Sequence, residues 1–155
     1  MYLAGPLGFF GAGQWYHAEV LVPAVARRFV VLDPWSEGEA IIDEFGGPDA
    51  ALAEGRLDAM NTAIGAANRA LIDRCDAVLA VLDGPDVDSG TAAEIGYATA
   101  LGKPVVGLRT DFRLSGENHA AVVNLQLAYF IRASGGRIVR ELDDALDALG
   151  AIARS

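Results

Sequence analysis

Four carboxylates lie close together near the middle of the chain. Asp83, Asp86 and Asp88 belong to one polar loop, and Glu94 ends the segment Ser-Gly-Thr-Ala-Ala-Glu that follows it. Gly90 leaves the backbone of this segment open to a ligand. A carboxylate in such a place can act as a nucleophile, and Glu94 is therefore the candidate catalytic residue.

Glu94 also has a purely structural explanation. Thr91-x-x-Glu94 matches a capping box, in which the hydroxyl and the carboxylate bind unpaired amides at the start of a helix. However, the preceding loop carries more carboxylate than a cap requires. The apolar positions Ile95, Ala98 and Leu101 predict a helix face that holds the first turn rigid. We therefore favour a catalytic Glu94, placed in the first turn of that helix.

The neighbouring elements must bring this loop to a ligand. Residues 77–82 (AVLAVL) predict a strand that is buried on both faces, and Asp83-Gly84-Pro85 turns the chain after it. In an open α/β sheet, ligands bind outside the carboxyl ends of the strands. The acidic loop lies at such an end.

The alternation of apolar runs with amphipathic segments predicts a single domain over residues 1–155. We expect a doubly wound, flavodoxin-like α/β fold, in which a five-stranded parallel sheet of order 2-1-3-4-5 has helices on both faces. The expected strands are residues 1–4, 29–32, 77–82, 104–108 and 137–139, and the expected helices are 14–28, 57–74, a segment from Thr91, 121–133 and 141–153. This order places the first strand beside the third, so that residues 2–8 lie next to the acidic loop.

Residues 36–54 show the least regular pattern of the chain. They are rich in acids and glycine. We expect a solvated loop with a short helix here, and the alternative is a lid over the site.

Composition excludes several classes of partner. The formal net charge of −9 speaks against a nucleic-acid polymer, which requires a basic surface, whereas a small uncharged ligand is compatible with it. No apolar run reaches the ~20 residues of a membrane span. Cys75 is alone, and His17 and His119 lack ligand spacing, so we interpret both histidines as incidental. We expect a cytoplasmic protein with no membrane partner, metal or organic cofactor.

Motifs in several parts of the chain resemble one family. The pattern D-G-x-x-x-D-S-G-T-x-x-E-x-G-Y-A over residues 83–98 continues into 102–104 (GKP) and 108–113 (LRTDFR). Together with residues 2–6 (YLAGP) and 123–125 (VNL), it resembles the nucleoside 2-deoxyribosyltransferases. The likeness spans most of the chain and implies an enzyme of nucleoside salvage, which takes a deoxynucleoside and a free purine or pyrimidine base.

The resemblance implies a double displacement. Glu94 would attack C1′ of the sugar, expel the base and hold a covalent deoxyribosyl intermediate, which a second base then attacks. Tyr2 matches a tyrosine that orients this nucleophile, or it is an ordinary strand aromatic. Asp88 matches a carboxylate that binds a sugar hydroxyl, or it caps a helix. Gly5 and Ser89 belong to the same motifs and are also expected to contact substrate.

Two residues near the C-terminal end of the matching motifs bear on subunit assembly and on contacts with the nucleobase. Asn124 matches an asparagine that reaches a sugar hydroxyl in a neighbouring subunit's site, which implies a homo-oligomer; a solvent-facing helix asparagine is the alternative. Gln126 stands where some family members carry methionine, so contacts to the base are expected to differ.

Asn68 departs from part of the family, which has an aspartate proposed to protonate the leaving base. An amide can hydrogen-bond a base or sugar but cannot be a general acid. Trp35 is expected to stack on the base, or it is a core or rim residue. Arg109, Asp111 and Arg113 are interpreted as a structural ion-pair cluster at the rim.

The residues of the acidic loop and of the first loop also indicate the class of substrate and the alternative functions. Asp88 would repel a phosphate, and residues 6–14 lack an arginine, so we expect an unphosphorylated nucleoside. If water completes the covalent step, the protein is instead an N-glycosidase of nucleosides or their monophosphates. A phosphoribohydrolase is disfavoured because its glycine-rich phosphate loop is missing. In a non-catalytic sensor of nucleotide derivatives, Glu94 would be only a cap.

Overall fold

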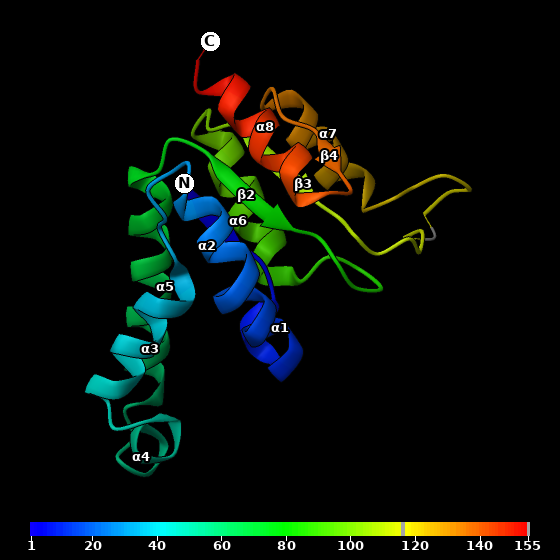
Figure 1. The fold of residues 1–155 in the computed structure, drawn as a ribbon. Coiled ribbons are helices and arrows are strands. Elements are labelled where there is room, and N and C mark those ends of the chain that lie inside the picture. The colour runs from blue at the N-terminus through cyan, green and yellow to red at the C-terminus, as the bar shows by residue number, and fades with distance from the viewer. Residues whose placement is uncertain (116, 155) are drawn as a thin grey trace.

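The computed structural model describes residues 1–115 and 117–154 and has an α/β fold. Its parallel sheet has the strand order β1-β2-β3-β4 (Figure 1). The strands are β1 (Tyr2–Ala4), β2 (Val78–Val81), β3 (Val105–Leu108) and β4 (Ile138–Val139). The register pairs Tyr2 with Val78, Val78 with Val105, and Gly107 with Ile138.

The expected strand over residues 29–32 is wrong, and among the described residues the sheet has four strands rather than five. This segment makes a single bridge, from Leu32 to Tyr2, on the free side of β1. Pairing stops there because Pro34 has no amide to donate and Asp33 already caps the next helix. Val30, before the bridge, is 81% exposed and has no sheet face to cover.

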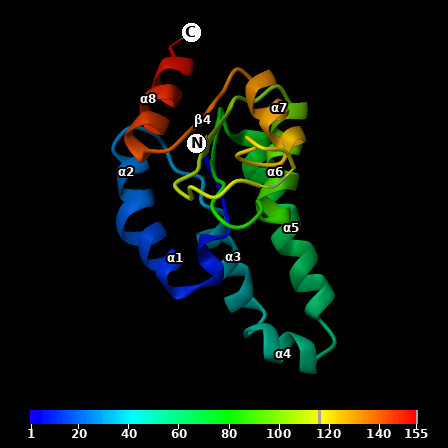
Figure 2. The same cartoon turned by 90° about the vertical axis from the view of Figure 1, so that its right-hand side faces the viewer.

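Helices cover both faces of the sheet (Figure 2). The short helix η1 (Leu7–Phe9) precedes the first face, which carries α1 (Gly11–Tyr16), η2 (His17–Leu21), α2 (Val22–Ala26) and α8 (Leu142–Ile152). The second face carries α5 (Leu57–Arg74), α6 (Ser89–Ala100) and α7 (Leu125–Ala133). Because both faces are buried, the strands are apolar throughout.

Alternation along the strands decides which residues meet which helices. Leu79 and Val81 of β2 pack on the side of α2 and α8, whereas Val78 and Ala80 pack on the side of α5, α6 and α7. Tyr2 of β1 belongs to this second side. The pleat of β1 therefore directs the Tyr2 side chain at α6.

Most of residues 36–54 is helical, so the expectation of a solvated loop with one short helix is wrong. The helices are α3 (Pro34–Glu44) and α4 (Pro48–Ala53). The Asp33 carboxylate accepts a hydrogen bond of 3.1 Å from the Trp35 amide, and Pro34 occupies the first turn, as is typical of helix starts. Gly46 and Gly47 have φ angles of 74° and 93°, which allow the turn between the two helices.

In the segment between β3 and α7, the described residues form neither helix nor strand. α7 begins at Leu125 rather than at residue 121, because Asn124 caps it. None of the described helices combines the length and the apolar character needed to cross a membrane.

Candidate active site

A cavity of about 320 Å³ opens where β1 and β2 end, between α3, α5 and the start of α6. Its volume falls in the range of small-molecule sites, ~300–1,000 Å³. Residues expected to contact substrate share its wall, namely Gly5, Trp35, Asn68, Asp88 and Glu94. The structure therefore brings together side chains from β1, α3, α5 and α6 that lie far apart in the sequence.

Glu94 lines this cavity, whereas Tyr2 does not line it and holds Glu94 from the buried side. Glu94 lies in the second turn of α6, and its Oε1 accepts a hydrogen bond of 2.6 Å from the hydroxyl of the fully buried Tyr2. Burial raises the pKa of Glu94 to about 7, which the Tyr2 hydrogen bond opposes and the charge of Asp88 reinforces. Burial and the adjacent Glu94 raise the pKa of Tyr2, so its hydroxyl remains the donor.

Asp88, rather than Thr91, caps α6, so the structural alternative of a capping box between Thr91 and Glu94 is wrong and the alternative of Asp88 as a helix cap is confirmed. The Asp88 Oδ2 accepts hydrogen bonds from the Thr91 amide at 2.9 Å and from the Thr91 hydroxyl at 3.1 Å. The helix therefore begins earlier than expected, and Glu94 moves from the first turn to the second. Asp88 is both the cap and part of the cavity wall, so the two explanations of this residue do not exclude each other.

Trp35 is held firmly in the cavity wall. Its Nε1 donates a hydrogen bond of 3.2 Å to the Gly5 carbonyl, and Phe9 packs edge-on against its ring at 4.8 Å between centroids. Gly8 lies so close that a Cβ there would come within 2.1 Å of the indole. The ring is thus fixed in one orientation beside the cavity, as a stacking surface requires.

His17 supports the same wall, although it was interpreted as incidental. Its Nε2 lies 3.0 Å from Asp33 Oδ2, while Asp33 Oδ1 accepts the Trp35 amide. His17 begins the π-helical stretch η2, and such stretches are frequent near functional sites. No spacing in the sequence signals this contact, because the two residues come from different elements.

Asn68 of α5 lines the cavity with an unsatisfied amide. Its Oδ1 is buried and has no hydrogen-bond partner in the described part of the chain. A buried acceptor without a partner is costly, and an N–H of a bound base would satisfy it. Residues of the wall that were not expected to contact substrate are Phe9, Pro34, Gly38, Glu39, Ile42, Ile64, Gly90 and Thr91.

Ser89, Asn124 and Gln126 do not line this cavity. Ser89 is the exposed first residue of α6. The Asn124 Oδ1 accepts the amides of Gln126 and Leu127, and its Nδ2 donates to Glu117 at 2.7 Å. Gln126 is exposed. A contact of Asn124 with a neighbouring subunit stays a prediction.

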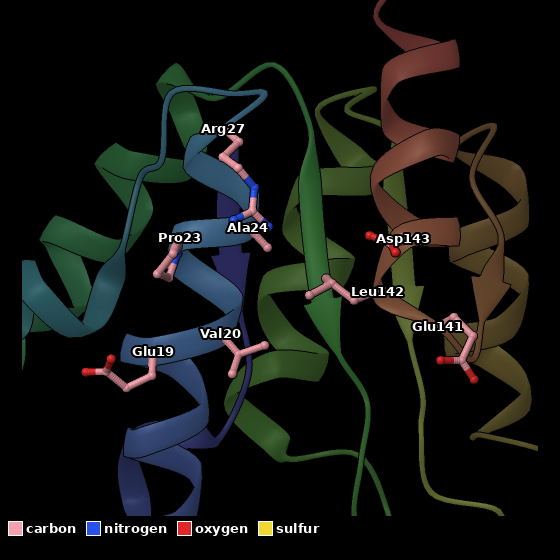
Figure 3. Close-up of a pocket in the computed structure, with 8 residues that line it drawn as sticks. All are labelled: Glu19, Val20, Pro23, Ala24, Arg27, Glu141, Leu142 and Asp143. Carbon is pink, nitrogen blue, oxygen red and sulfur yellow. The ribbon is translucent and has the colours of Figure 1, made fainter.

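A second cavity, of about 350 Å³, lies between α2 and the start of α8 (Figure 3). Three carboxylates line it, but that of Glu19 points away from Glu141 and Asp143 (Figure 3). None of the residues expected to contact substrate lies here. Nor does any group of three or more His, Cys, Asp or Glu side chains within residues 1–115 and 117–154 form a metal site. The cavity at Glu94 is therefore the candidate active site.

Comparison with known proteins places these residues in a family. A model of the nucleoside 2-deoxyribosyltransferase family matches residues 1–126, which include the whole wall of the Glu94 cavity. The chain belongs to the nucleoside 2-deoxyribosyltransferase family. This match confirms the family that the sequence motifs indicated. Nucleoside 2-deoxyribosyltransferases are glycosyltransferases that act on nucleosides.

Solved structures support this membership over nearly the whole chain. A 2-deoxyribosyltransferase from Leishmania mexicana is 27% identical with a TM-score of 0.59, and the match covers 94% of this chain and 93% of that one. A conserved protein from Enterococcus faecalis is 31% identical with a TM-score of 0.73, covering 97% and 96%. An uncharacterised protein of Schizosaccharomyces pombe is 49% identical over 51 residues, which are 30% of this chain and only 24% of that protein.

Proposed function

We propose that the protein exchanges the base of 2′-deoxyribonucleosides by a retaining double displacement through Glu94. The observation that carries this proposal is the half-buried Glu94 carboxylate, which accepts a hydrogen bond of 2.6 Å from Tyr2 and lies in a cavity that Asp88 and Trp35 also line. Family membership supports nucleosides as substrates. Retaining chemistry at a sugar needs one such nucleophilic carboxylate near the anomeric carbon.

In the first step, Glu94 bonds to C1′ while the bond between C1′ and the base nitrogen breaks. Tyr2 occupies Oε1, so Oε2 is the attacking oxygen. The electron pair of the broken bond leaves with the base, which must also gain a proton. Asn68 cannot supply that proton, so we assign it to solvent that enters the cavity.

In the second step, a nitrogen of the incoming base attacks C1′ from the face that the first base left. The bond from C1′ to Glu94 breaks, its electrons return to the carboxylate, and the incoming base loses its proton. Two inversions give a nucleoside of the original configuration. Stacking on Trp35 and a hydrogen bond to Asn68 would hold either base in the same place.

The wall favours an unphosphorylated nucleoside. Asp88 Oδ2 is used by the helix cap, and Oδ1 faces no partner among the described residues, so it can accept a sugar hydroxyl. The same carboxylate repels a phosphate dianion. No Lys or Arg side chain lines this cavity, so nothing on its wall offsets that repulsion.

Base exchange in solution tests the proposal. The protein is incubated with deoxyinosine or thymidine and an excess of adenine, and products are separated by chromatography. Deoxyadenosine is expected. Free base and deoxyribose without deoxyadenosine would make the protein a hydrolase, and binding without either product would make it a sensor.

The rate should depend on the ionisation of Glu94. Only the carboxylate form attacks, and the pKa of Glu94 is raised to about 7, so kcat/KM should fall about tenfold per pH unit below that value. Above it the rate should level off, because Tyr2 stays protonated. Initial rates from about pH 5 to about pH 9 check this. A profile that stays flat down to about pH 5 would contradict it.

Gly8→Ala should disturb the base-binding wall. The new methyl group would lie 2.1 Å from the Trp35 ring, which must shift. We expect KM for the nucleoside to rise about tenfold, with a loss of about 1–3 kcal/mol in the free energy of unfolding. Steady-state kinetics and denaturant titration measure both. Gly11→Ala is the matched control, since a Cβ there meets no atom within 4 Å. Equal effects of the two changes would refute this role of Trp35.

A further inference from the structure

Arginines gather around a cavity of about 550 Å³ that shares no lining residue with the candidate active site. It lies between α7, β4 and the segment that precedes α7, which are brown, orange and yellow in Figure 1. Its wall contains Arg109, Arg132, Arg137 and Arg140 and no acidic residue. In a chain of net charge −9, this is a local concentration of positive charge.

Arg109 is a buried cation that forms no ion pair with a carboxylate among the described residues. It is 1% exposed, and its guanidinium donates to the carbonyls of Leu82, Gly84 and Arg113. Its Nε has no hydrogen-bond partner among the described residues. The expected three-residue ion-pair cluster is therefore wrong, because Asp111 pairs with Arg113 alone. A buried charge with a free N–H is unfavourable unless an anion or acceptor meets it.

Asp111 does not neutralise the buried charge of Arg109. Its carboxylate receives hydrogen bonds from the Arg113 side chain, which chiefly lower its pKa, and the charge of Arg109 contributes only a smaller part. Asp111 also does not line the cavity. The positive charge that faces the cavity is thus left without a counter-ion in the described part of the chain.

The other arginines are free to move onto a ligand. Arg132 and Arg137 are exposed, and no hydrogen bond or ion pair ties either side chain to a described residue. Arg140 donates only to the Asp111 carbonyl, at 3.2 Å. The backbone holds them near Arg109, whose amide bonds to Val139 in β4 at 2.9 Å. Guanidinium groups arranged in this way bind phosphate with paired hydrogen bonds.

Apart from Asn118, the residues that line the remaining wall are apolar and suit an organic body. Val122, Val123, Leu125, Ala128 and Ile138 line it, and Leu125 is 51% exposed. A bare inorganic ion would leave this surface unused. A phosphate group carries a charge of about −1.5 to −2 and so compensates more than one guanidinium, which a single carboxylate does not.

We propose that this cavity binds a small phosphate monoester whose body is apolar or planar, such as a nucleotide. Arg109, Arg132 and Arg137 hold the phosphate, and the apolar wall contacts the body. Three of its arginines, 132, 137 and 140, lie beyond residues 1–126 that match the family. The proposal does not depend on the proposed reaction, because the site is separate from Glu94 and its test needs no turnover.

Isothermal titration with adenosine 5′-monophosphate tests the proposal. The key variant is Arg132→Gln combined with Arg137→Gln, both exposed, so that folding is preserved. The matched control is Arg74→Gln combined with Arg154→Gln, which removes two exposed charges elsewhere. We expect one nucleotide per chain, at least about tenfold weaker binding in the key variant and less than about twofold change in the control. Excess adenosine should not displace the nucleotide, and Glu94→Ala should bind it normally.

Other outcomes would overturn the proposal. Equal weakening in both double variants would show a net-charge effect. Displacement by adenosine, or loss of binding in Glu94→Ala, would place the nucleotide in the active site. Inorganic phosphate binding as tightly as the nucleotide would remove any role for the apolar wall. A self-association that the key variant abolishes in sedimentation runs would make this face a subunit interface instead.

Discussion

Glu94→Gln is expected to lower kcat for base exchange by at least about 10³-fold, because the amide cannot form the bond to C1′. Chromatography of the exchange reaction measures the loss. Mass spectrometry of wild type mixed with deoxynucleoside alone should show a deoxyribosyl adduct on a peptide that contains Glu94. The adduct should be absent from the variant. Retention of more than about a tenth of the activity would contradict a nucleophilic Glu94.

The stability of Glu94→Gln separates loss of chemistry from loss of fold. Burial raises the pKa of Glu94 from 4.5 to about 7, so the folded state holds this proton more tightly than the unfolded chain. The resulting stability is present below the unfolded-state pKa and is lost as pH rises to about 7. The variant does not ionise and should therefore be more stable than wild type at about pH 8, by about 1–3 kcal/mol. A less stable variant at that pH would contradict the raised pKa.

Tyr2→Phe should have the second largest effect, about 10- to 100-fold on kcat. The Tyr2 hydroxyl donates to Glu94 Oε1 and lowers the pKa of that carboxyl, in opposition to burial. Without this bond, the pKa of Glu94 rises further and its attacking oxygen loses its orientation. The acid limb of the rate profile should therefore move to higher pH, which a merely structural tyrosine would not cause.

A matched control isolates the hydroxyl of Tyr2. Tyr129→Phe makes the same chemical change at a side chain that is 59% exposed and does not line the Glu94 cavity. It should leave both kcat and the pH profile unchanged. If Tyr2→Phe loses activity but its acid limb stays in place, Tyr2 contributes packing rather than control of Glu94.

The apolar strands were predictable because a strand that is buried on both faces is a continuous run of apolar residues in the sequence. The run over residues 77–82 became β2, and its pairing with β1 was expected from the strand order. That pairing is enough to bring Tyr2 towards the acidic loop. The central pair of the candidate site could thus be inferred before any coordinates, because sheet topology positions it.

The far wall of the cavity could not be inferred in the same way. α3 has polar and glycine positions that hide its helical period, and its start depends on Asp33 and Pro34 acting together. The position of Glu39 of α3 in the cavity wall was therefore not predicted. Contacts such as His17 with Asp33 depend on how two helices pack, which no local pattern records. The sequence left the cap of α6 open because Asp88 and Thr91 are both good caps, three residues apart.

The hydrogen bond between Tyr2 and Glu94 spans 92 positions of the chain. During synthesis, β1 emerges well before β2, and until then Leu32 offers it only a single bridge. Glu94 and the Tyr2 hydroxyl meet only after the ribosome has made α6. The ability to catalyse the proposed reaction should therefore arise late in synthesis and in a single step. This is expected when contacts between residues far apart in the sequence complete a parallel sheet. A nascent chain that stops before α6 contains Tyr2 but lacks Glu94, the nucleophile of the proposed reaction.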